Sequence, residues 1–427
     1  MYNYEKISAN VRNIFNNIIK NNLENDGLKA YDGFYNNVIK LSEDQNHYEK
    51  CFKIINPLFN DYLDNFLKLD AEKFNSEPNN KKKIICFYFP NIINSLAHIE
   101  FFNKIFRLFN DDSYELWIAS NLSIPSPISK FIQELIDKKI IKELIHVDIL
   151  SLTNVKLFTY KYKNYFDKFV VWGLPLIIPL WTRLFFEKVF YVTTKFEYGS
   201  FPGLDNAISF QSKKDFKTTK IINKTCWHRL PPFFPYHQYN EHYKIYDNKL
   251  IKLISVNRPE KINDPIFLNA LKKILMFNEN VKFYYCGRTQ NKQLNDFFIS
   301  NKLISRIVFL GWIDPKDVIG DYDIFLDSPS LSGILSANYF IAGIPVVSYN
   351  TSLSYIVLNN KELQKKLNHN FIFDDIEYVK YTNRLIRDKN YLKKISSVQK
   401  KSKDIFIRNN ELIIKIFIET LYEANTI

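Results

Sequence analysis

The chain has 427 residues, 46% of them hydrophobic, and its 58 lysines and arginines outnumber its 45 aspartates and glutamates, which gives a formal net charge of +13. The length suggests two or three domains, and the apolar content excludes a disordered chain because it can fill sizeable cores. The charge permits phosphorylated ligands, nucleic acid or an anionic membrane surface. The lysines are scattered and form no basic stripe, so we expect no nucleic-acid partner.

The N-terminal residues and the apolar segments indicate the compartment. Residues 1–13 contain no apolar signal core, and the longest apolar run, residues 169–181, is shorter than the roughly 20 residues of a membrane-spanning helix. The chain has four widely separated cysteines, which we expect to be free thiols: Cys51, Cys86, Cys226 and Cys286. We therefore expect a cytoplasmic protein and leave open a peripheral contact with the inner, anionic face of the membrane.

Apolar periodicity predicts the elements of the first half. Residues 1–80 read as helical, with Val11, Ile14, Phe15 and Ile18 at helical spacing, and nothing in them suggests chemistry. Strands and helices then alternate. Strands are expected at 84–89, 114–119, 145–150, 169–172 and 189–193, and helices at 96–108, 128–135 and 181–186. This alternation is typical of an open α/β sheet.

The alternation restarts after a proline- and aromatic-rich connector at residues 225–239. Strands are expected at 252–256, 281–286, 307–310 and 324–326 and from 344, and helices at 265–276, 293–301, 334–341, 375–387 and 407–424. We predict four parts: a helical N-terminal extension (1–80), a first Rossmann-like domain for the acceptor (81–240), a second for the nucleotide (241–405) and a closing helix (406–427).

Residues 323–349 predict the most specific local structure, a strand, a small-residue loop, a helix and a second strand. Ser332, Gly333 and Ser336 place backbone N–H groups and hydroxyls where that helix begins, and the helix dipole favours an anion there. A diphosphate is the expected ligand. The alternative is a serine N-cap on a purely structural helix.

Two upstream segments follow predicted strands. Arg258 and Lys261 lie in a loop where they could neutralise phosphate, although a solvated turn is the alternative. Residues 309–313, which include Trp312 and Ile313, could present backbone groups to the edge of a base, although an ordinary turn is the alternative.

Taken in this order, these segments resemble the C-terminal half of GT-B glycosyltransferases. The likeness is greatest to the O-linked N-acetylglucosamine transferases and the related bacterial adhesin N-glucosyltransferases. It lies in residues 228–236, 261–275 and 323–347 and covers roughly residues 220–350. It implies two Rossmann-like domains that face a central cleft.

The resemblance also implies roles for individual residues. Lys261 would contact the diphosphate, and Asn338 stands where the family has a carboxylate for the ribose, which is a departure. The residues expected to bind the donor are Arg258, Lys261, Trp312, Ile313, Ser332, Gly333, Leu335, Ser336 and Asn338.

The expected chemistry is inverting and metal-independent. Ser330 and Asn338 occupy the spacing at which many retaining GT-B enzymes have paired glutamates. His98 is the first candidate for the general base, with Glu100 beside it and His228 as a second choice.

No metal or cofactor is expected beyond the nucleotide sugar itself. The residues at 321–323 read Asp-Tyr-Asp, a pattern that binds a metal in the other major glycosyltransferase fold. They precede a buried strand, however, so we expect a turn there.

The resemblance thus implies a glycosyltransferase that moves a hexose or N-acetylhexosamine from UDP-glucose or UDP-N-acetylglucosamine to a protein side chain or a bacterial surface glycan. Two alternatives remain. One is a non-catalytic GT-B module that binds a nucleotide sugar or scaffolds a partner glycosyltransferase. The other is a nucleic-acid binder, which the net charge suggests.

Overall fold

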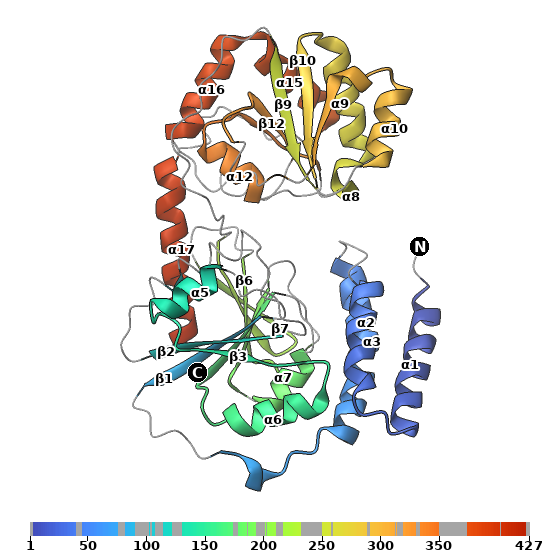
Figure 1. The fold of residues 1–427 in the computed structure, drawn as a ribbon, viewed down its shortest axis with the longest axis vertical. Coiled ribbons are helices and arrows are strands. Elements are labelled where there is room, and N and C mark those ends of the chain that lie inside the picture. The colour runs from blue at the N-terminus through green and yellow to red at the C-terminus, as the bar shows by residue number, and fades with distance from the viewer. Residues whose placement is uncertain are drawn as a thin grey trace. The chain divides into compact units, whose positions relative to one another are not determined.

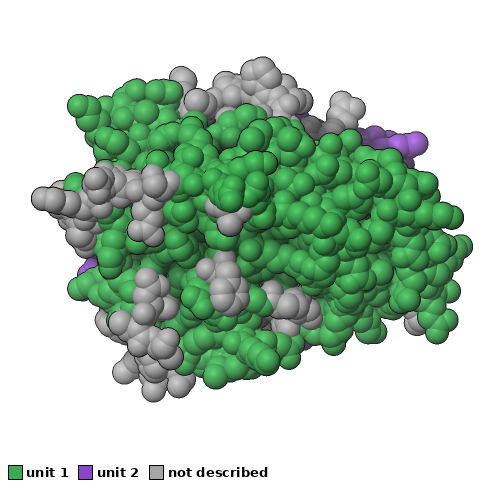
Figure 2. Space-filling model, turned by 90° about the horizontal axis from the view of Figure 1, so that it is seen from below, with its two compact units in different colours: residues 1–95, 102–231, 415–427 green, residues 96–101, 232–414 purple. Residues whose placement is uncertain are grey.

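The structure is a computed structural model. It describes residues 3–39, 45–75, 82–89, 102, 105–106, 114–121, 130–173, 178–185, 187–193, 201, 203–210, 217–231, 250–257, 259–287, 291–311, 313, 319–329, 334–349, 374–401 and 403–423. The chain divides into two compact units (Figure 2). Unit 1 comprises Met1–Ser95, Phe102–Pro231 and Lys415–Ile427, and unit 2 comprises Leu96–Phe101 and Pro232–Ile414.

The N-terminal extension of unit 1 is helical, as predicted. Its helices are α1 (Tyr4–Lys20), α2 (Asp26–Asn37) and α3 (Gln45–Phe66). The side chain of Asn3 caps α1 by accepting a hydrogen bond from the backbone N–H of Lys6, 3.0 Å away. The apolar stripe of α1, formed by Val11, Phe15 and Ile18, is buried in the same core as the first sheet.

The described residues of unit 1 form an eight-stranded sheet in the order β3-β2-β1-β4-β5-β6-β8-β7 (Figure 1). Its strands are β1 (Lys83–Phe89), β2 (Tyr114–Ser120), β3 (Glu143–His146), β4 (Lys168–Gly173), β5 (Val189–Thr193), β6 (Asn206–Ser209), β7 (Thr218–Ile222) and β8 (Thr225–Arg229). All described pairings are parallel except that of β7 with β8. The order of β1 to β6 is that of a Rossmann fold.

Helices cover both faces of this sheet. The helices α1 to α3, α6 (Leu152–Tyr162) and α7 (Ile178–Leu184) share one aromatic-rich core with it. On the opposite face, Phe87 contacts Phe102 and Phe106, which lie in a helical segment. A further helix, α5, spans Lys130–Asp137.

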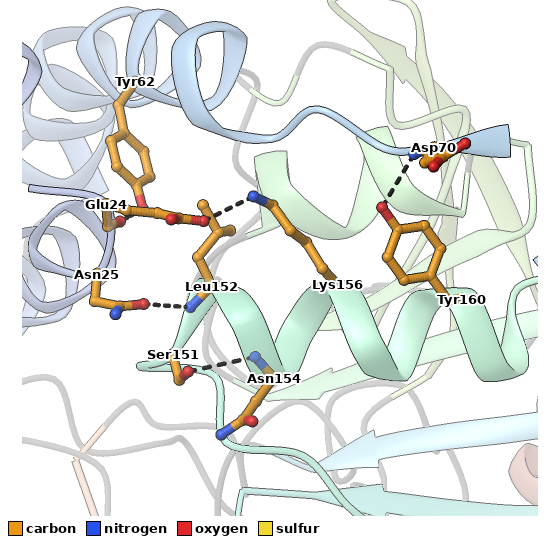
Figure 3. Close-up of polar contacts among 9 residues, drawn as sticks. All are labelled: Glu24, Asn25, Tyr62, Asp70, Ser151, Leu152, Asn154, Lys156 and Tyr160. Carbon is orange, nitrogen blue, oxygen red and sulfur yellow. Dashed lines mark hydrogen bonds and ion pairs between the residues drawn. The ribbon is translucent and has the colours of Figure 1, made fainter. Parts of the chain in front are cut away.

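Polar contacts fasten the N-terminal extension to α6 (Figure 3). The backbone N–H of Leu152 donates to Asn25 Oδ1 at 2.9 Å, and Lys156 Nζ lies 2.7 Å from Glu24 Oε1. The backbone N–H of Asp70 donates to the Tyr160 hydroxyl at 3.0 Å. The extension is thus part of the first folding unit, joined to it by a shared core and by specific hydrogen bonds.

The described residues of unit 2 form a five-stranded, all-parallel sheet in the order β11-β10-β9-β12-β13 (Figure 1). Its strands are β9 (Ile251–Val256), β10 (Val281–Cys286), β11 (Ile307–Gly311), β12 (Ile324–Leu326) and β13 (Val346–Val347). Its helices are α8 (Pro259–Ile262), α9 (Pro265–Phe277), α10 (Lys292–Ser300), α12 (Ile334–Ile341), α15 (Asp375–Arg387) and α16 (Lys389–Lys401). The core on one face includes α9, α10, α15 and α16, and the core on the other includes α12.

The last helix, α17 (Lys403–Glu423), begins in unit 2, and its residues from Lys415 onward belong to unit 1. Within unit 1, the Phe417 ring lies 6.1 Å from the Trp172 ring, and Lys168 Nζ donates to the Tyr422 carbonyl at 3.4 Å. A cation at the last turn of a helix is favourable because that end carries partial negative charge.

The structure corrects several element predictions. The segment predicted as a connector from 225 begins with strand β8, whose Trp227 and His228 are buried. The strand predicted at 145–150 is β3, which ends at His146, and the strand predicted from 344 begins at Val346. Lys261 lies in the short helix α8, where a loop was expected.

No helix among the described residues is both long and apolar enough to cross a membrane.

Candidate functional site

The order in which the chain adds strands to the unit 2 sheet switches from one side of β9 to the other between β9 and β12. We call this topological switch point the strand reversal, although all five strands run parallel. Strands β10 and β11 lie on one side of β9, and β12 and β13 lie on the other. In open parallel sheets, ligands bind beyond the carboxyl ends of the two strands at such a reversal. The segments that leave those two ends are α8 after β9 and the residues that lead into α12 after β12. They contain Lys261 and the serine-rich segment that the sequence singled out.

Lys261 is partly buried, and contacts made by the residues on either side of it fix the position of its backbone. The next side chain, Ile262, is completely buried in the unit 2 core. The N–H of Asn263 donates to the Pro259 carbonyl at 3.1 Å, and Asp264 caps α9 by accepting hydrogen bonds from two backbone N–H groups. A short helix between a strand and a capped helix gives Lys261 a defined position.

Side-chain amides join this segment to the segment after β10. Asn263 Nδ2 donates to Asn291 Oδ1 at 3.0 Å, and Asn291 Nδ2 donates to Asn263 Oδ1 at 2.8 Å. Asn291 is also the N-cap of α10, because its Oδ1 accepts from the Leu294 N–H at 3.0 Å. The carboxyl ends of β9 and β10 are therefore linked.

A glycine and a tyrosine pack against each other at the carboxyl ends of β9 and β10. The Tyr285 hydroxyl donates to the Asn257 carbonyl at 3.0 Å, and Asn257 Nδ2 donates to Ser255 Oγ at 3.2 Å. A Cβ atom at Gly287 would overlap the Tyr285 side chain and approach the Asn257 carbonyl oxygen to 3.0 Å. Only glycine fits this position without a shift of its neighbours.

The end of β12 has a network of buried polar groups. Asp327 is completely buried, and its Oδ2 accepts a hydrogen bond from Ser348 Oγ at 3.3 Å. The Tyr378 hydroxyl donates to the Asp327 carbonyl at 2.9 Å. Ser328 follows and is also completely buried. No sequence pattern predicts a role for Asp327 or Ser328, because burial at this edge of the sheet depends on tertiary packing.

Helix α12 begins at Ile334, beyond the carboxyl end of β12. Its backbone includes Leu335, and the side chains of Ser336 and Asn338 are buried. Tyr339 stacks on Phe325 of β12, with the ring centroids 4.4 Å apart, and so packs the helix on its strand. The N-terminus of α12 thus lies at the strand reversal, where its dipole favours an anion.

The structure describes only part of the predicted site. Lys261, Ser336 and Asn338 lie on the segments that leave β9 and β12. Ile313 follows β11, and its carbonyl accepts a hydrogen bond from Cys286 Sγ at 3.5 Å. The predicted residues outside the described part of the chain are His98, Glu100, Arg258, Trp312, Ser332 and Gly333.

His228, the second choice for a general base, is the fourth of the five residues of β8 and pairs in parallel register with Ile208 of β6. Its Nε2 is 3.2 Å from Asn206 Oδ1, at the amino end of β6. Burial and nearby Lys217 lower the pKa of His228 to about 4, with Glu423 acting in the opposite direction. His228 thus lies one residue before the carboxyl end of β8, the edge at which parallel sheets bind ligands, and its role as a base stays a prediction.

The Asp-Tyr-Asp segment has a structural role at its second aspartate. Asp323 is buried, and its Oδ2 accepts a hydrogen bond from the backbone N–H of Lys252 at 2.8 Å. Burial raises the pKa of Asp323, and that hydrogen bond opposes the rise. The carboxylate therefore joins the amino ends of β9 and β12, at the edge of the sheet opposite their carboxyl ends.

No protein-family model matches the sequence, and no curated protein matches it. Solved structures do match its fold. An O-GlcNAc transferase mutant from Thermobaculum terrenum has a TM-score of 0.62 at 12% identity, over 98% of this chain and 84% of that one. A glycosyltransferase from Rickettsia africae has a TM-score of 0.57 at 13% identity, over 81% of this chain and 100% of that one. An Anabaena protein in complex with UDP-glucose has a TM-score of 0.52 at 12% identity, over 79% and 99%.

At these identities the likeness shows the fold alone. The chain has the GT-B fold, built from two Rossmann-like units, as its sequence predicted.

Proposed function

We propose that this protein is a glycosyltransferase that moves a hexose or N-acetylhexosamine from a UDP sugar to an acceptor. The observation that supports this most directly is the convergence of two segments at the strand reversal of unit 2. One contains Lys261, and the other leads into the N-terminus of α12. A cation and a helix N-terminus together suit a diphosphate.

In the proposed mechanism, these groups stabilise the UDP leaving group. Negative charge grows on the diphosphate as its bond to the sugar breaks. Lys261 and the dipole of α12 would lower the energy of that charge without a metal ion. The absence of the paired glutamates of many retaining relatives favours inversion, and His98 with Glu100 stays the proposal for the base that activates the acceptor.

The donor is proposed from the resemblance and from the neighbours. One neighbouring structure was solved with UDP-glucose, and another protein is named an O-GlcNAc transferase. UDP-glucose and UDP-N-acetylglucosamine are therefore the first donors to test. The acceptor is proposed to be a protein side chain or a bacterial surface glycan.

The test is a donor screen that measures free UDP after incubation with each UDP sugar. Release of UDP by the wild-type protein, lost in Lys261→Ala, supports the transferase. Tight binding with no turnover under several donors and acceptors would instead support the non-catalytic module. A donor-positive preparation would then be used to find modified acceptors in cells by mass spectrometry.

We also propose a peripheral contact with an anionic membrane through one face of α16, the α16 lysine face. The face is defined by five exposed residues: Lys389, Lys393, Lys394, Lys400 and Lys401. At 3.6 residues per turn they fall within an arc of about 140°. Helix α16 has no acidic residue, and its opposite face is buried against the unit 2 core. Each lysine near an anionic bilayer contributes roughly 1 kcal/mol.

A further inference from the structure

Two large apolar side chains are exposed side by side at the end of α9. Met276 is 62% exposed and Phe277 is 61% exposed, and they are the last two residues of the helix. Among the exposed large apolar side chains of the described residues, they form the only pair that is consecutive in the sequence, and Phe277 is the only aromatic one. Single exposed apolar residues are ordinary in folded proteins, so it is this pair that requires an explanation.

Hydrogen bonds from two arginines hold the end of α9 in place. Arg306 donates through Nη1 to the Leu275 carbonyl at 3.4 Å and through Nη2 to the Asn278 carbonyl at 2.5 Å. Arg387 donates through Nη2 to the Phe277 carbonyl at 2.9 Å and through Nε to Asn278 Oδ1 at 3.1 Å. The two cations also suit the partial negative charge of a helix C-terminus. The exposed pair therefore projects from a fixed backbone.

The end of α9 lies at the amino edge of the unit 2 sheet, opposite α8 (Figure 1). The chain runs from it into β10, and the segment that enters the neighbouring strand β11 has two further exposed apolar side chains, Ile299 and Ile304. Arg306 belongs to that segment and reaches the carbonyls of α9, so the two segments are in contact. Exposed apolar side chains thus occur on both segments at this edge, away from the carboxyl ends proposed to bind the nucleotide.

Cations outnumber carboxylates at this edge. The segments that end there contain the cations Lys302, Arg306, Arg387 and Lys389 and the carboxylates Glu279 and Asp388. Asp388 Oδ1 accepts a hydrogen bond from the Tyr391 N–H at the start of α16. Because Arg387 contacts Phe277 and Lys389 is the first residue of α16, the apolar pair adjoins the α16 lysine face.

We propose that Met276 and Phe277 insert into the headgroup region of an anionic bilayer beside the α16 lysine face. This inference rests on the membrane contact proposed for that face and adds an apolar anchor to it. Contacts at a membrane surface combine electrostatic attraction with burial of apolar side chains, and one signal alone binds weakly. A second copy of the chain is a poorer partner, because a stable protein interface takes about 20–30 residues a side.

The test is the partition of the purified protein onto vesicles of phosphatidylglycerol and phosphatidylcholine. Met276→Ser combined with Phe277→Ser should lower the partition coefficient at low salt about tenfold, equivalent to about 1.4 kcal/mol. At high salt the wild type should keep a residual binding that this double variant lacks, because burial of apolar surface is not screened by salt. The thermal unfolding midpoint should not change, because both side chains are exposed in the folded protein.

Two controls separate insertion from a general loss of apolar surface. Met276→Leu combined with Phe277→Leu keeps the apolar character of the pair and should bind like the wild type. Leu157→Ser removes a side chain that is 59% exposed on α6 of unit 1, and it should also leave the partition coefficient unchanged.

Insertion itself is measured with Phe277→Trp and vesicles whose acyl chains contain bromine, which quenches tryptophan fluorescence. The four described tryptophans are buried: Trp117, Trp172, Trp181 and Trp227. The variant should therefore gain an emission that shifts to shorter wavelength on binding, with quenching beyond that of the wild type.

Other outcomes overturn the proposal in distinguishable ways. Vesicle binding that is unchanged in the serine double variant, without extra quenching of Phe277→Trp, would leave the α16 lysine face as a purely electrostatic contact. A dimer of the wild type that the serine double variant loses would assign the pair to an interface between copies. If the wild type binds no anionic vesicles, the α16 contact and this anchor fail together, whereas the proposed transfer reaction is unaffected.

Discussion

Asn263 and Asn291 exchange two side-chain hydrogen bonds, 3.0 and 2.8 Å long, between segments that follow different strands of unit 2. Asn263 lies two residues after Lys261, and Asn291 caps α10. The amide pair therefore couples the position of the proposed phosphate-binding lysine to the packing of the neighbouring helix.

The first prediction concerns this amide pair. Asn263→Ala should cost about 1 kcal/mol of stability, and Asn291→Ala should cost roughly 1–3 kcal/mol, because it removes the cap of α10 as well. Both variants should weaken UDP binding by loosening the segment that contains Lys261. Urea unfolding and UDP titration would measure these effects. Asn291→Asp keeps the cap and loses the amide donor, so it should recover part of the stability. Equal stability losses in the two alanine variants would show that the cap of α10 contributes little.

Gly287 leads to a second prediction. Gly287→Ala should destabilise unit 2 by roughly 1–3 kcal/mol, because the added methyl group meets the Tyr285 side chain and the Asn257 carbonyl. The matched control is Gly33→Ala in α2, where nothing lies within 4 Å of the new Cβ. There alanine should stabilise the protein by about 0.5–1 kcal/mol, because glycine disfavours helix. Thermal unfolding of both variants checks these signs, and the same sign in both would contradict the packing described for Gly287.

The third prediction is that the free energy of unfolding depends on pH because of the buried Lys168. Burial and nearby Lys83 lower the pKa of Lys168 from its ordinary value of 10.5 to about 8, and Asp167 opposes the shift. Below pH 8 the ammonium is charged in both the folded and the unfolded state, so the folded protein bears the full cost of burying it. Between about pH 8 and 10.5 only the unfolded state keeps the proton, so the stability due to this group rises with pH.

The measurement is the free energy of unfolding of wild type minus that of Lys168→Met, taken from pH 7 to pH 10. This difference should increase by roughly 1–3 kcal/mol over that range. Lys83→Met is the companion variant. It removes the repelling charge, so the pKa of Lys168 should rise and the increase should begin at higher pH. A difference that stays flat with pH would show that Lys168 titrates near its ordinary value.

The α16 lysine face gives a prediction about membranes. Vesicles that contain an anionic phospholipid should co-sediment the wild-type protein at low salt, and vesicles of neutral phosphatidylcholine should not. Binding should weaken as salt rises, because the contact is electrostatic. Replacing Lys393, Lys394 and Lys401 by glutamate should abolish it.

The control replaces three exposed lysines of unit 1, Lys138, Lys139 and Lys142, by glutamate, which gives the same change in net charge. This control should keep its vesicle binding. Equal loss in both triple variants would indicate a general effect of net charge. Binding to duplex DNA with a steep salt dependence, and no binding to vesicles, would favour the nucleic-acid alternative.

The sequence predicted those elements whose pattern is complete in a single stretch. The strand at 281–286 and the helix at 375–387 have the predicted bounds, because each is an uninterrupted periodic segment between polar residues. The prediction failed at β8, because the prolines just beyond Arg229 made this segment read as a connector and not as a strand of five residues. It also failed at α8, which has only four residues. Helical periodicity cannot be recognised in so short a segment.

The candidate site was predictable in part for a similar reason. Lys261 and the serine-rich segment stand out because each follows an apolar strand. The strand order that brings them to one edge emerges only from the sheet. Asp327 has no distinguishing pattern, since its burial and the hydrogen bond that it accepts from Ser348 depend on groups distant in the sequence.

The proposal that unit 2 binds the diphosphate of a UDP sugar through Lys261 is tested most directly by titrating UDP into wild type and Lys261→Ala by calorimetry. The exposed Lys292→Ala variant serves as a charge-matched control. Wild type and Lys292→Ala should bind UDP equally, and Lys261→Ala should bind it at least about tenfold more weakly, because a charged phosphate contact is worth roughly 1.5–3 kcal/mol. No binding by wild type, or the same affinity in all three proteins, would contradict the assignment of this site.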